Sequence, residues 1–338
     1  IDSLTTIMSK IIIGIHGLGN KPPFHTLQKW WEMSIGDGLN SINHPFPLFN
    51  FKFVYWANFV YSEPLDPKEK NVEHPLFLED PYSPEGKIER GEPEPLQKKI
   101  RDYLERQLDK LLLNEDLTIN FSSISDFIIH HFFHDLEIYY SSNLPDEDRA
   151  NYLAREAIRE TLADTLRSHP NDEILLIAHS MGSIIAYDVL TKIVPDITID
   201  TLVTCGSPLG IPVIMNKIKA EQENNDQSLS VPENIARLWY NLSDLDDRVA
   251  INYNLADDYQ KNSKGVAIID KQVHNTYEFN GEKNPHKSFG YLRTPEMSEI
   301  IYTFLCRGRS PVSVWLTERL YRLFYRERKK IKGNDYES

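Results

Sequence analysis

The stretch that decides the fold runs from Ile174 to Ser183 and reads ILLIAHSMGS. It opens with five apolar residues, which is typical of a buried strand in a parallel sheet. Two small residues, Ala178 and Gly182, lie two positions before and after Ser180. A sharp strand-to-helix turn needs small residues at these places, because a bulky side chain would collide with a neighbouring strand or helix. The pattern therefore predicts a turn that presents the Ser180 hydroxyl as a nucleophile.

The composition excludes several other classes of protein. A length of 338 residues suits one large α/β domain with an insertion, or two modest domains. The net charge of -13 would repel nucleic acids and anionic bilayers, so we expect no nucleic-acid partner. The two cysteines, Cys205 and Cys306, lie far apart and do not indicate an oxidising compartment. Without a secretory signal or a membrane-spanning stretch in the sequence, we expect a cytoplasmic protein.

Short β-branched and aromatic runs alternate with segments of helical period. This alternation predicts an α/β fold with a mostly parallel sheet flanked by helices. We predict strands at Lys10–Ile15, Phe49–Trp56, Glu173–Ala178, Ile199–Thr204, Ala236–Asn241 and Val266–Val273, and helices at Thr26–Leu39, Arg149–Ser168 and Ser183–Val194. Ligands of such sheets bind beyond the carboxyl ends of the strands, which is where we expect the site.

The segment after the second predicted strand does not follow this alternation of strands and helices. We predict an α/β core made of residues 8–60 and 149–310, and a helical insertion at 61–148 with helices at Leu96–Leu113 and Ile124–Tyr140. We expect this insertion to form a cap or lid, and a surface excursion is the alternative. Residues 311–338 form the third segment, a basic amphipathic helix and tail. We expect the helix to pack against the core, although peripheral contact with a membrane is possible.

A glycine-rich turn, Gly14–Asn20, follows the first predicted strand. Stabilising an oxyanion needs two N–H groups, one from the residue after the nucleophile and one from this first loop. We therefore predict the backbone amides of Met181 and Leu18 as the oxyanion hole. A phosphate-binding loop is the competing interpretation, but the glycine spacing fits neither a dinucleotide fingerprint nor a P-loop.

With these features the chain resembles lipase- and esterase-like members of the α/β-hydrolase superfamily, which carry Ala-His-Ser-x-Gly elbows and a His-Gly oxyanion loop. The resemblance covers most of the chain apart from residues 61–148 and the C-terminal tail. It implies that an acid and a histidine follow the serine in chain order, each on a loop after a later strand.

The acid is expected in residues 243–250, which resemble the Asp-x-Val-Ala/Pro segment of that superfamily. This alignment selects Asp247, and it predicts that Val249 anchors the loop in the core. Asp244 and Asp246 remain alternatives, because aspartates in a turn often serve only the turn.

The base is expected among the histidines that follow the acid in sequence, which are His274 and His286. His274 falls in a strand-like pattern, which favours a structural role. His286 lies in a loop before a helix whose predicted N-cap is Thr294, followed by a proline. This is where members of the superfamily place the general base, so we predict His286 and keep His274 as the alternative.

Other residues complete the predicted site. By resemblance, Ser207, Pro208 and Leu209 line the substrate pocket. We also assign His16, Gly17 and His179 to substrate binding. His16 belongs to the same neighbourhood, where its ring is expected to fix the oxyanion loop.

A second group of histidines falls in the insertion. His130 and His134 have the i,i+4 spacing that could chelate a metal, with His131 and Asp135 nearby. The sequence lacks the glutamate of a zinc protease at this motif and offers no evident third ligand. We therefore predict no metal site.

Together these residues predict a serine hydrolase that cleaves a small-molecule or lipid ester through an acyl-enzyme on Ser180, without a cofactor. Thioester or amide cleavage by the same residues is one alternative, and a binding protein that kept the fold without turnover is another.

Overall fold

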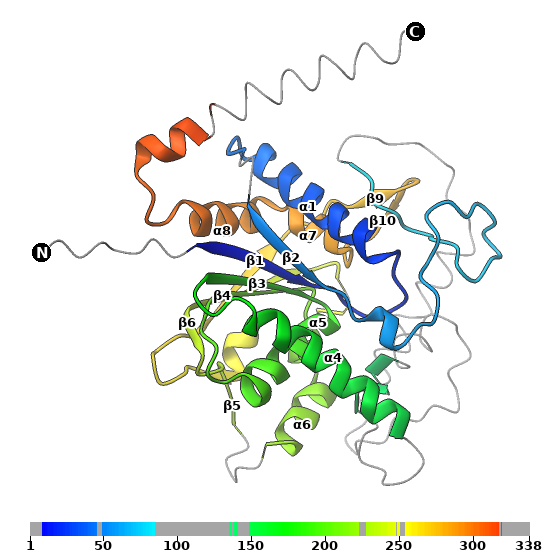
Figure 1. Cartoon of the computed structure of the whole chain (residues 1–338), viewed down its shortest axis with the longest axis horizontal. Helices are drawn as coiled ribbons and strands as arrows, with labels where there is room; N and C mark the ends of the chain where they lie inside the picture. The colour runs from blue at the N-terminus through cyan, green and yellow to red at the C-terminus, as the bar shows by residue number, and fades with distance from the viewer. Residues whose placement is uncertain are drawn as a thin grey trace, which may run out of the picture.

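Six parallel strands form the central sheet of the computed structural model, in the order β2-β1-β3-β4-β6-β8 (Figure 1). Their bounds are β1 Lys10–Ile15, β2 Asn50–Val54, β3 Glu173–His179, β4 Ile199–Cys205, β6 Ile235–Asp244 and β8 Ile268–Val273. Each neighbouring pair is parallel, so the predicted fold is confirmed. The structure describes residues 9–45, 49–84, 135–136, 138–140, 149–222, 228–247, 249–250, 254–317 and 319.

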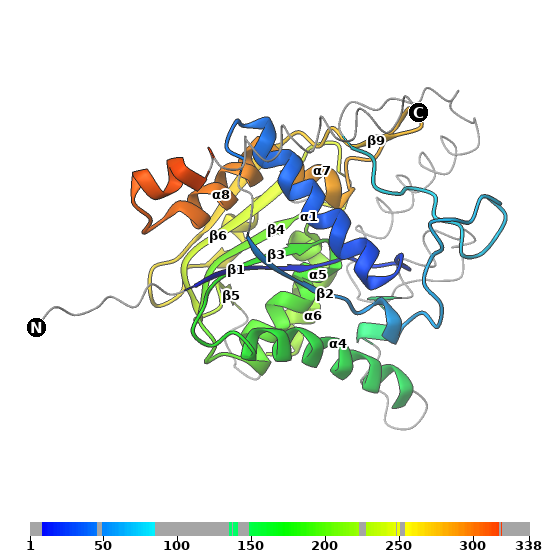
Figure 2. The ribbon, with the colours of Figure 1, turned by 45° about the horizontal axis from the view of Figure 1, so that its top comes forward.

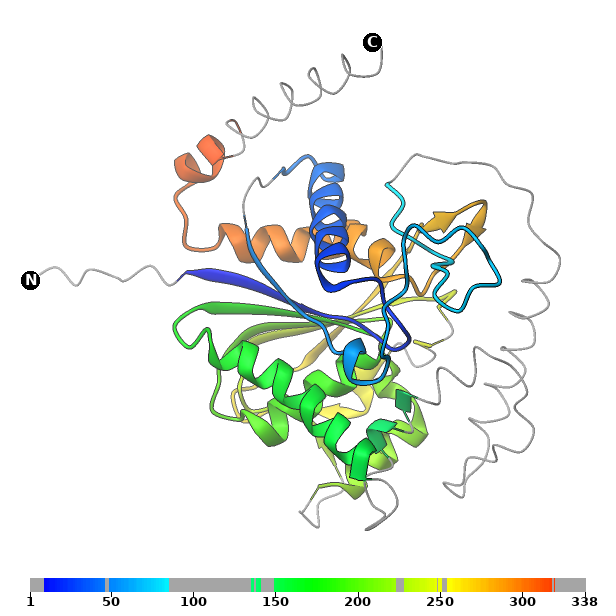
Figure 3. The ribbon, with the colours of Figure 1, turned by 45° about the vertical axis from the view of Figure 1, so that its right-hand side comes forward.

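Helices cover both faces of the sheet. One layer holds α1 Phe24–Ser41, α7 Ser288–Arg293 and α8 Pro295–Cys306, and the other holds α4 Arg149–Arg167, α5 Met181–Asp188 and α6 Pro212–Ala220 (Figure 2 and Figure 3). Shorter elements are the helical turns η1 Ala57–Phe59, η3 Val189–Ile193, η4 Pro208–Gly210 and η5 Leu255–Asp257, and the strands β5 Leu229–Ser230, β7 Tyr259–Gln260, β9 Glu278–Phe279 and β10 Glu282–Lys283. The predicted helix Ser183–Val194 therefore begins two residues earlier and finishes as the π-helical turn η3.

The side chains of β3 show how the sheet separates two apolar cores. Ile174, Leu176 and Ala178 pack into the core under α4, α5 and α6. The intervening residues Leu175 and Ile177 pack into the core under α1, α7 and α8. Because successive side chains of a strand point to opposite faces, a continuous apolar run is what a strand buried on both faces requires.

The strand order reverses between β1 and β3. The chain passes from β1 to β2 on one side, and it later returns to β3 on the other side of β1. Ligands of open α/β sheets bind at such a switch point, beyond the carboxyl ends of the strands. The turn with Leu18 follows β1 there, and Ser180 follows β3, so the topology brings the two predicted halves of the site together.

Parts of the predicted insertion are described. Residues 61–84 contain a single isolated bridge, between Asp66 and Phe77, and otherwise irregular backbone. Residues 135–136 and 138–140 are helical, and Leu136 and Tyr139 are buried in the core beside α4 and α5. The predicted helix Leu96–Leu113, most of Ile124–Tyr140 and the histidines His130, His131 and His134 lie outside the described residues.

The described start of the C-terminal segment, residues 311–317, does not show the packing that we expect for this helix. Residues 311–317 are helical, and Figure 1 shows them beyond α8. Val312 is 66% exposed, and Trp315 and Leu316 are about half exposed, so this part does not bury its apolar side chains against the described core. The Arg319 guanidinium covers the Trp315 ring at 4.8 Å. The remainder of the predicted helix lies outside the described residues.

Across the described ranges of the chain, none of the helices combines the length and the apolar character needed to cross a bilayer.

The close approach of α5 to β1 makes Gly182 a test of this packing. A Cβ atom added there would lie 2.7 Å from the carbonyl oxygen of His16 and 2.9 Å from that of Ile15. Both oxygens belong to backbone that cannot move freely, so we expect Gly182→Ala to lower the unfolding free energy by about 2 kcal/mol in urea titrations. Gly36→Ala on α1 is the matched control, because its Cβ would meet nothing within 4 Å. That variant should gain roughly 0.5–1 kcal/mol, and equal effects at both positions would contradict this packing.

Candidate active site

Ser180 stands at the junction of β3 and α5 in a backbone conformation that non-glycine residues rarely adopt. Its φ is 54° and its ψ is -129°. Such a residue costs about 1–3 kcal/mol and persists only where the surroundings enforce it. The Ser180 N–H donates to the Cys205 carbonyl at 3.0 Å, and the Ser183 N–H donates to the Ser180 carbonyl at 2.8 Å. The predicted sharp turn is therefore present, and it holds the Ser180 side chain above the end of β3.

The structure brings Ser180, His286 and Asp247 together in one chain of hydrogen bonds. The Ser180 hydroxyl lies 3.0 Å from Nε2 of His286. On the other side of the ring, Nδ1 of His286 lies 2.9 Å and 3.0 Å from the two carboxylate oxygens of Asp247. Because an ionised carboxylate only accepts hydrogen bonds, Nδ1 carries the proton and Nε2 is free to accept from Ser180.

Asp247 is buried and ionised. Burial alone would raise the pKa of this carboxyl, but His286 and the hydrogen bonds from His286, Tyr291 and the Val249 N–H outweigh it and lower the pKa below its ordinary value. The Tyr291 hydroxyl donates to Asp247 at 2.6 Å, and the Val249 N–H donates at 3.0 Å. The sequence predicts Val249 as an apolar anchor. In the structure its side chain is only half-buried, and it is the backbone amide that holds the acid.

The alternatives for acid and base lie elsewhere. Asp244 is buried and accepts the N–H groups of Asp246 and Asn275, which makes it part of the loop's own framework. Asp246 is exposed. The His274 side chain is 72% exposed and lies 3.7 Å from Asp244, on the surface.

Asn275 fixes the loop that carries His286, and the sequence analysis did not identify it. Its side-chain Nδ2 donates to the carbonyls of Pro285 and Lys287 at 2.7 and 2.9 Å, one on each side of His286. A Cβ at Gly290 would overlap the Asn275 amide oxygen at 1.6 Å, so the first turn of α7 needs glycine here. The role of Asn275 depends on tertiary contacts, and no local motif marks it.

Two further histidines support the site as neutral rings. His179 donates from Nε2 to the His286 carbonyl at 2.7 Å. His16 donates from Nδ1 to the Gly17 carbonyl at 2.7 Å and accepts the Trp56 N–H at Nε2 at 3.0 Å. Burial lowers the pKa of both rings well below the ordinary value, with His286 adding to the effect on His179 and Lys21 adding to that on His16. These bonds fit the expectation that His16 fixes the loop.

The two amides predicted for the oxyanion hole flank Ser180. The Met181 N–H belongs to the first residue of α5, where a helix offers no internal acceptor. The turn after β1 approaches so closely that a Cβ at Gly17 would lie 2.6 Å from the Ser180 Cβ, and Leu18 is the next residue. Within the described residues, neither the Leu18 nor the Met181 amide has a hydrogen-bond partner. Both are available to a ligand.

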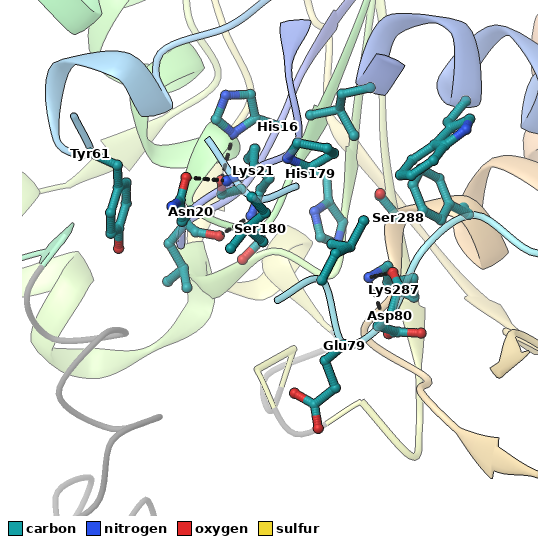
Figure 4. A pocket seen from close by; sticks show the side chains of 18 of the residues that line it. His16, Asn20, Lys21, Tyr61, Glu79, Asp80, His179, Ser180, Lys287 and Ser288 are labelled. Atoms are coloured by element: carbon teal, nitrogen blue, oxygen red, sulfur yellow. Dashed lines mark hydrogen bonds and ion pairs between the residues drawn. The ribbon is translucent and has the colours of Figure 1, made fainter. Parts of the chain in front are cut away.

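A pocket of about 620 Å³ opens beside Ser180 and His286. Figure 4 shows Ser180 next to His179 and Lys21, with Asp80 and Lys287 at another side of the pocket. Its charged wall residues are Lys21, Glu63, Glu79, Asp80 and Lys287, and its apolar wall residues are Leu18, Pro22, Leu27, Trp30, Trp31, Leu65, Pro75, Leu76, Phe77, Leu78 and Phe289. Residues 61–80 of the predicted insertion therefore form one wall, which the sequence analysis did not resolve to individual side chains.

Of the residues assigned to substrate binding, His16, Gly17 and His179 line the pocket. Ser207, Pro208 and Leu209 do not line the pocket in the described part of the chain, and all three are buried. The Ser207 hydroxyl instead lies 2.8 Å from that of Ser183 and caps the turn η4. The strand β4 ends at the expected edge of the sheet, but the chain after it turns beneath α5 rather than into the pocket.

A comparison with family models gives the lineage of this site. The model of the PGAP1-like alpha/beta domain matches residues 98–290, more than half of the chain. The chain belongs to this family. PGAP1-like domains lie within the α/β-hydrolase superfamily, so the family supports a hydrolase. The matched range contains Ser180, Asp247 and His286, and it leaves β1 and the turn with Leu18 outside. The comparison with curated proteins found no match.

The lowered pKa of Asp247 predicts how stability depends on pH. The pKa of an aspartate carboxyl in the unfolded chain is about 3.9. If the pKa in the folded protein is lower, the ionised carboxyl stabilises the fold at pH values above about 3.9, and this stabilisation is lost as the pH falls through the folded pKa. Asp247→Asn should therefore cost about 2 kcal/mol of unfolding free energy at about pH 5, and the difference from wild type should narrow toward pH 3. Asp246→Asn should change the unfolding free energy by less than about 0.5 kcal/mol. A cost for Asp247→Asn that stays constant over this range would count against the ionised, hydrogen-bonded acid.

Proposed function

We propose that this chain is a serine hydrolase that cleaves carboxylic esters through an acyl-enzyme on Ser180. The observation that carries the proposal is the continuous hydrogen-bonded chain from the Ser180 hydroxyl through His286 to Asp247. A nucleophile, a base and a group that orients the base within hydrogen-bonding distance of each other are the arrangement that nucleophilic acyl transfer needs.

In the first half of the reaction, the Ser180 oxygen attacks the ester carbonyl carbon while Nε2 of His286 takes the hydroxyl proton. The carbonyl oxygen becomes an oxyanion, and we assign the amides of Leu18 and Met181 as its hydrogen-bond donors. Asp247 keeps the proton of His286 on Nδ1 and stabilises the imidazolium. Collapse of the intermediate breaks the bond to the leaving oxygen, and His286 returns its proton to that oxygen. The alcohol leaves and the acyl group stays on Ser180.

In the second half, water occupies the place of the alcohol. His286 removes a proton from the water as its oxygen attacks the acyl carbon, and the tetrahedral intermediate is held by the same two amides. Collapse returns the proton to Ser180 and releases the carboxylic acid. The sum is one ester and one water converted into one acid and one alcohol, so the reaction needs no cofactor.

The pocket wall supports an apolar acyl group. Leu27 and Trp30 on α1, Leu76 and Phe77 from the insertion and Phe289 in α7 all line the pocket. The Trp30 ring is held edge-on against Phe289 at 5.9 Å between centroids and stacks with Tyr82 at 6.3 Å. A volume near 620 Å³ lies in the range of pockets that enclose a small organic ligand.

An activity probe tests the nucleophile directly. We expect a fluorophosphonate to label the wild-type protein on Ser180, and we expect Ser180→Ala and His286→Gln to lose labelling and at least about 10⁴-fold in kcat for p-nitrophenyl esters. The reason is that each variant removes one member of the proton-transfer chain.

Two matched variants separate this site from the alternatives. Ser207→Ala removes a buried serine outside the pocket wall, and His274→Gln removes the exposed histidine that follows Asp247 in sequence. Both should still be labelled. Absence of labelling in the folded wild-type protein would favour a binding protein without turnover.

Acyl-chain preference tests the apolar wall. Each methylene buried in the pocket contributes about 0.8 kcal/mol, so kcat/KM of the wild type should rise roughly fourfold for each carbon added to a p-nitrophenyl ester until the pocket is filled. Trp30→Ala should flatten this rise while leaving the acetate ester nearly unchanged. The measurement is kcat/KM from acetate to palmitate.

Met33→Ala is the control for Trp30→Ala, because Met33 lies one turn further along α1 and is exposed. This variant should retain the wild-type dependence on chain length. If Trp30→Ala reduces all esters equally, the acyl group does not bind along this wall.

A further inference from the structure

One peptide group of the oxyanion loop is held at both ends. The peptide between Leu18 and Gly19 offers its carbonyl to the Lys21 ammonium, which donates a hydrogen bond to it. The N–H of the same peptide, on Gly19, donates to Oδ2 of Asp135 at 2.5 Å. A cation and an anion therefore form hydrogen bonds with opposite ends of a single peptide plane. This plane is next to the Leu18 amide that we assign to the oxyanion hole.

This peptide needs such a restraint. Gly19 has a φ of +83°, a region that glycine enters as readily as its mirror image. Rotation of the Leu18–Gly19 plane changes the ψ of Leu18 and redirects the loop that presents the Leu18 N–H. Without fixed partners, several loop orientations would be close in energy. Charge-assisted hydrogen bonds at both ends select one of them.

Asp135 comes from the insertion and is firmly placed. It is 1% exposed, and its second oxygen accepts the Tyr61 hydroxyl at 2.7 Å. The next residue, Leu136, and Tyr139 are packed in the core beside α4 and α5. The Tyr139 hydroxyl donates to the buried Asp188 at 2.8 Å, and Asp188 also pairs with Arg159 at 2.6 Å. The segment with Asp135 is therefore anchored to the body of the fold.

Lys21 is charged near neutral pH. Burial lowers the pKa of this ammonium to about 8, with Lys287 lowering it and Asp135 raising it. It therefore remains mostly protonated at pH 7. Its neighbour Asn20 is fixed as well, because the Asn20 Nδ2 donates to the Glu63 carbonyl at 2.8 Å. The end of the loop at Gly19 and Asn20 thus depends on residues of the insertion.

We propose that Asp135 and Lys21 are positioning residues that clamp the Leu18–Gly19 peptide and thereby hold the Leu18 amide toward the oxyanion. The insertion then takes part in catalysis by supplying Asp135, in addition to lining the pocket. This inference rests on the proposed function for its catalytic consequence, whereas the clamp itself can be measured without turnover.

The first test is hydrogen exchange at the Gly19 amide, followed by mass spectrometry or NMR. Asp135→Ala removes the acceptor, and Lys21→Met removes the ammonium while keeping most of the apolar stem. We expect exchange of this amide to rise about 10-fold or more in each variant. Asp135→Ala removes the acceptor of the Gly19 N–H, and Lys21→Met removes the hydrogen bond to the carbonyl of the same peptide. Two variants are used so that a folding defect in one leaves the other to decide.

The matched control is Glu233→Ala. Glu233 also accepts a backbone N–H from a loop, that of Ser263 at 3.0 Å, and it lies before β6, at the end of the sheet opposite Ser180. This variant should leave exchange at Gly19 and the labelling of Ser180 unchanged. Wild-type exchange at Gly19 in both Asp135→Ala and Lys21→Met would overturn the clamp.

The second test measures the catalytic consequence. The rate of fluorophosphonate labelling and kcat should fall about 10- to 100-fold in each variant with KM nearly unchanged, which is less than the loss of a whole oxyanion donor. In the double variant the fall should not exceed that of the larger single variant, because both residues hold one peptide. Multiplicative losses would overturn a shared clamp. If exchange rises as expected but the wild type neither reacts with the probe nor hydrolyses esters, the clamp stands and the proposed function fails.

Discussion

The strained turn at Ser180 is the constraint on which the rest of the site depends. A positive φ at a non-glycine residue is unfavourable by about 1–3 kcal/mol, and here it is enforced from both sides. The end of β4 accepts the Ser180 N–H through Cys205, while Ser183 bonds the Ser180 carbonyl through both its N–H and its hydroxyl. At Gly182, α5 lies in close contact with the backbone at the end of β1, which restricts any change in the conformation of the turn.

Around this turn, buried polar groups are arranged so that one ring is free to move a proton. His16 and His179 are neutral, and both nitrogens of His16 and Nε2 of His179 are engaged with backbone groups. Among the histidines in the described ranges, His286 is the one that joins a serine on one side to a buried carboxylate on the other. The Asp247 carboxylate accepts hydrogen bonds from Tyr291 and from a backbone amide. A buried charge needs such hydrogen bonds to offset the loss of water. The polar framework therefore fixes both the orientation and the tautomer of His286.

The sequence predicted the strands of the central sheet because each is a short segment that contains β-branched or aromatic residues, as in the apolar run of β3 and the alternating pattern of β2. It also predicted the residues that meet at the switch point, since chain order within the hydrolase superfamily restricts the choice to a few side chains. Tyr291, Asn275, Lys21 and Asp135 escaped prediction for a physical reason. Their partners are distant in sequence, as with the bond between Asp135 and Gly19 across 116 positions, and nothing in their local pattern differs from an ordinary helix or loop. Ser207 lies outside the described pocket wall, because the position of β4 in the sheet does not fix the direction of the turn that follows it.

The proposed mechanism requires Ser180, His286 and the amides of Leu18 and Met181 to converge on a single reacting carbonyl group. A crystal structure of the protein after reaction with a phosphonate ester tests this most directly, since the phosphorus adopts the tetrahedral geometry of the intermediate. We expect phosphorus bonded to the Ser180 oxygen and a phosphoryl oxygen about 3 Å from both amide nitrogens. An adduct on another residue, or a phosphoryl oxygen directed away from Leu18 and Met181, would contradict it.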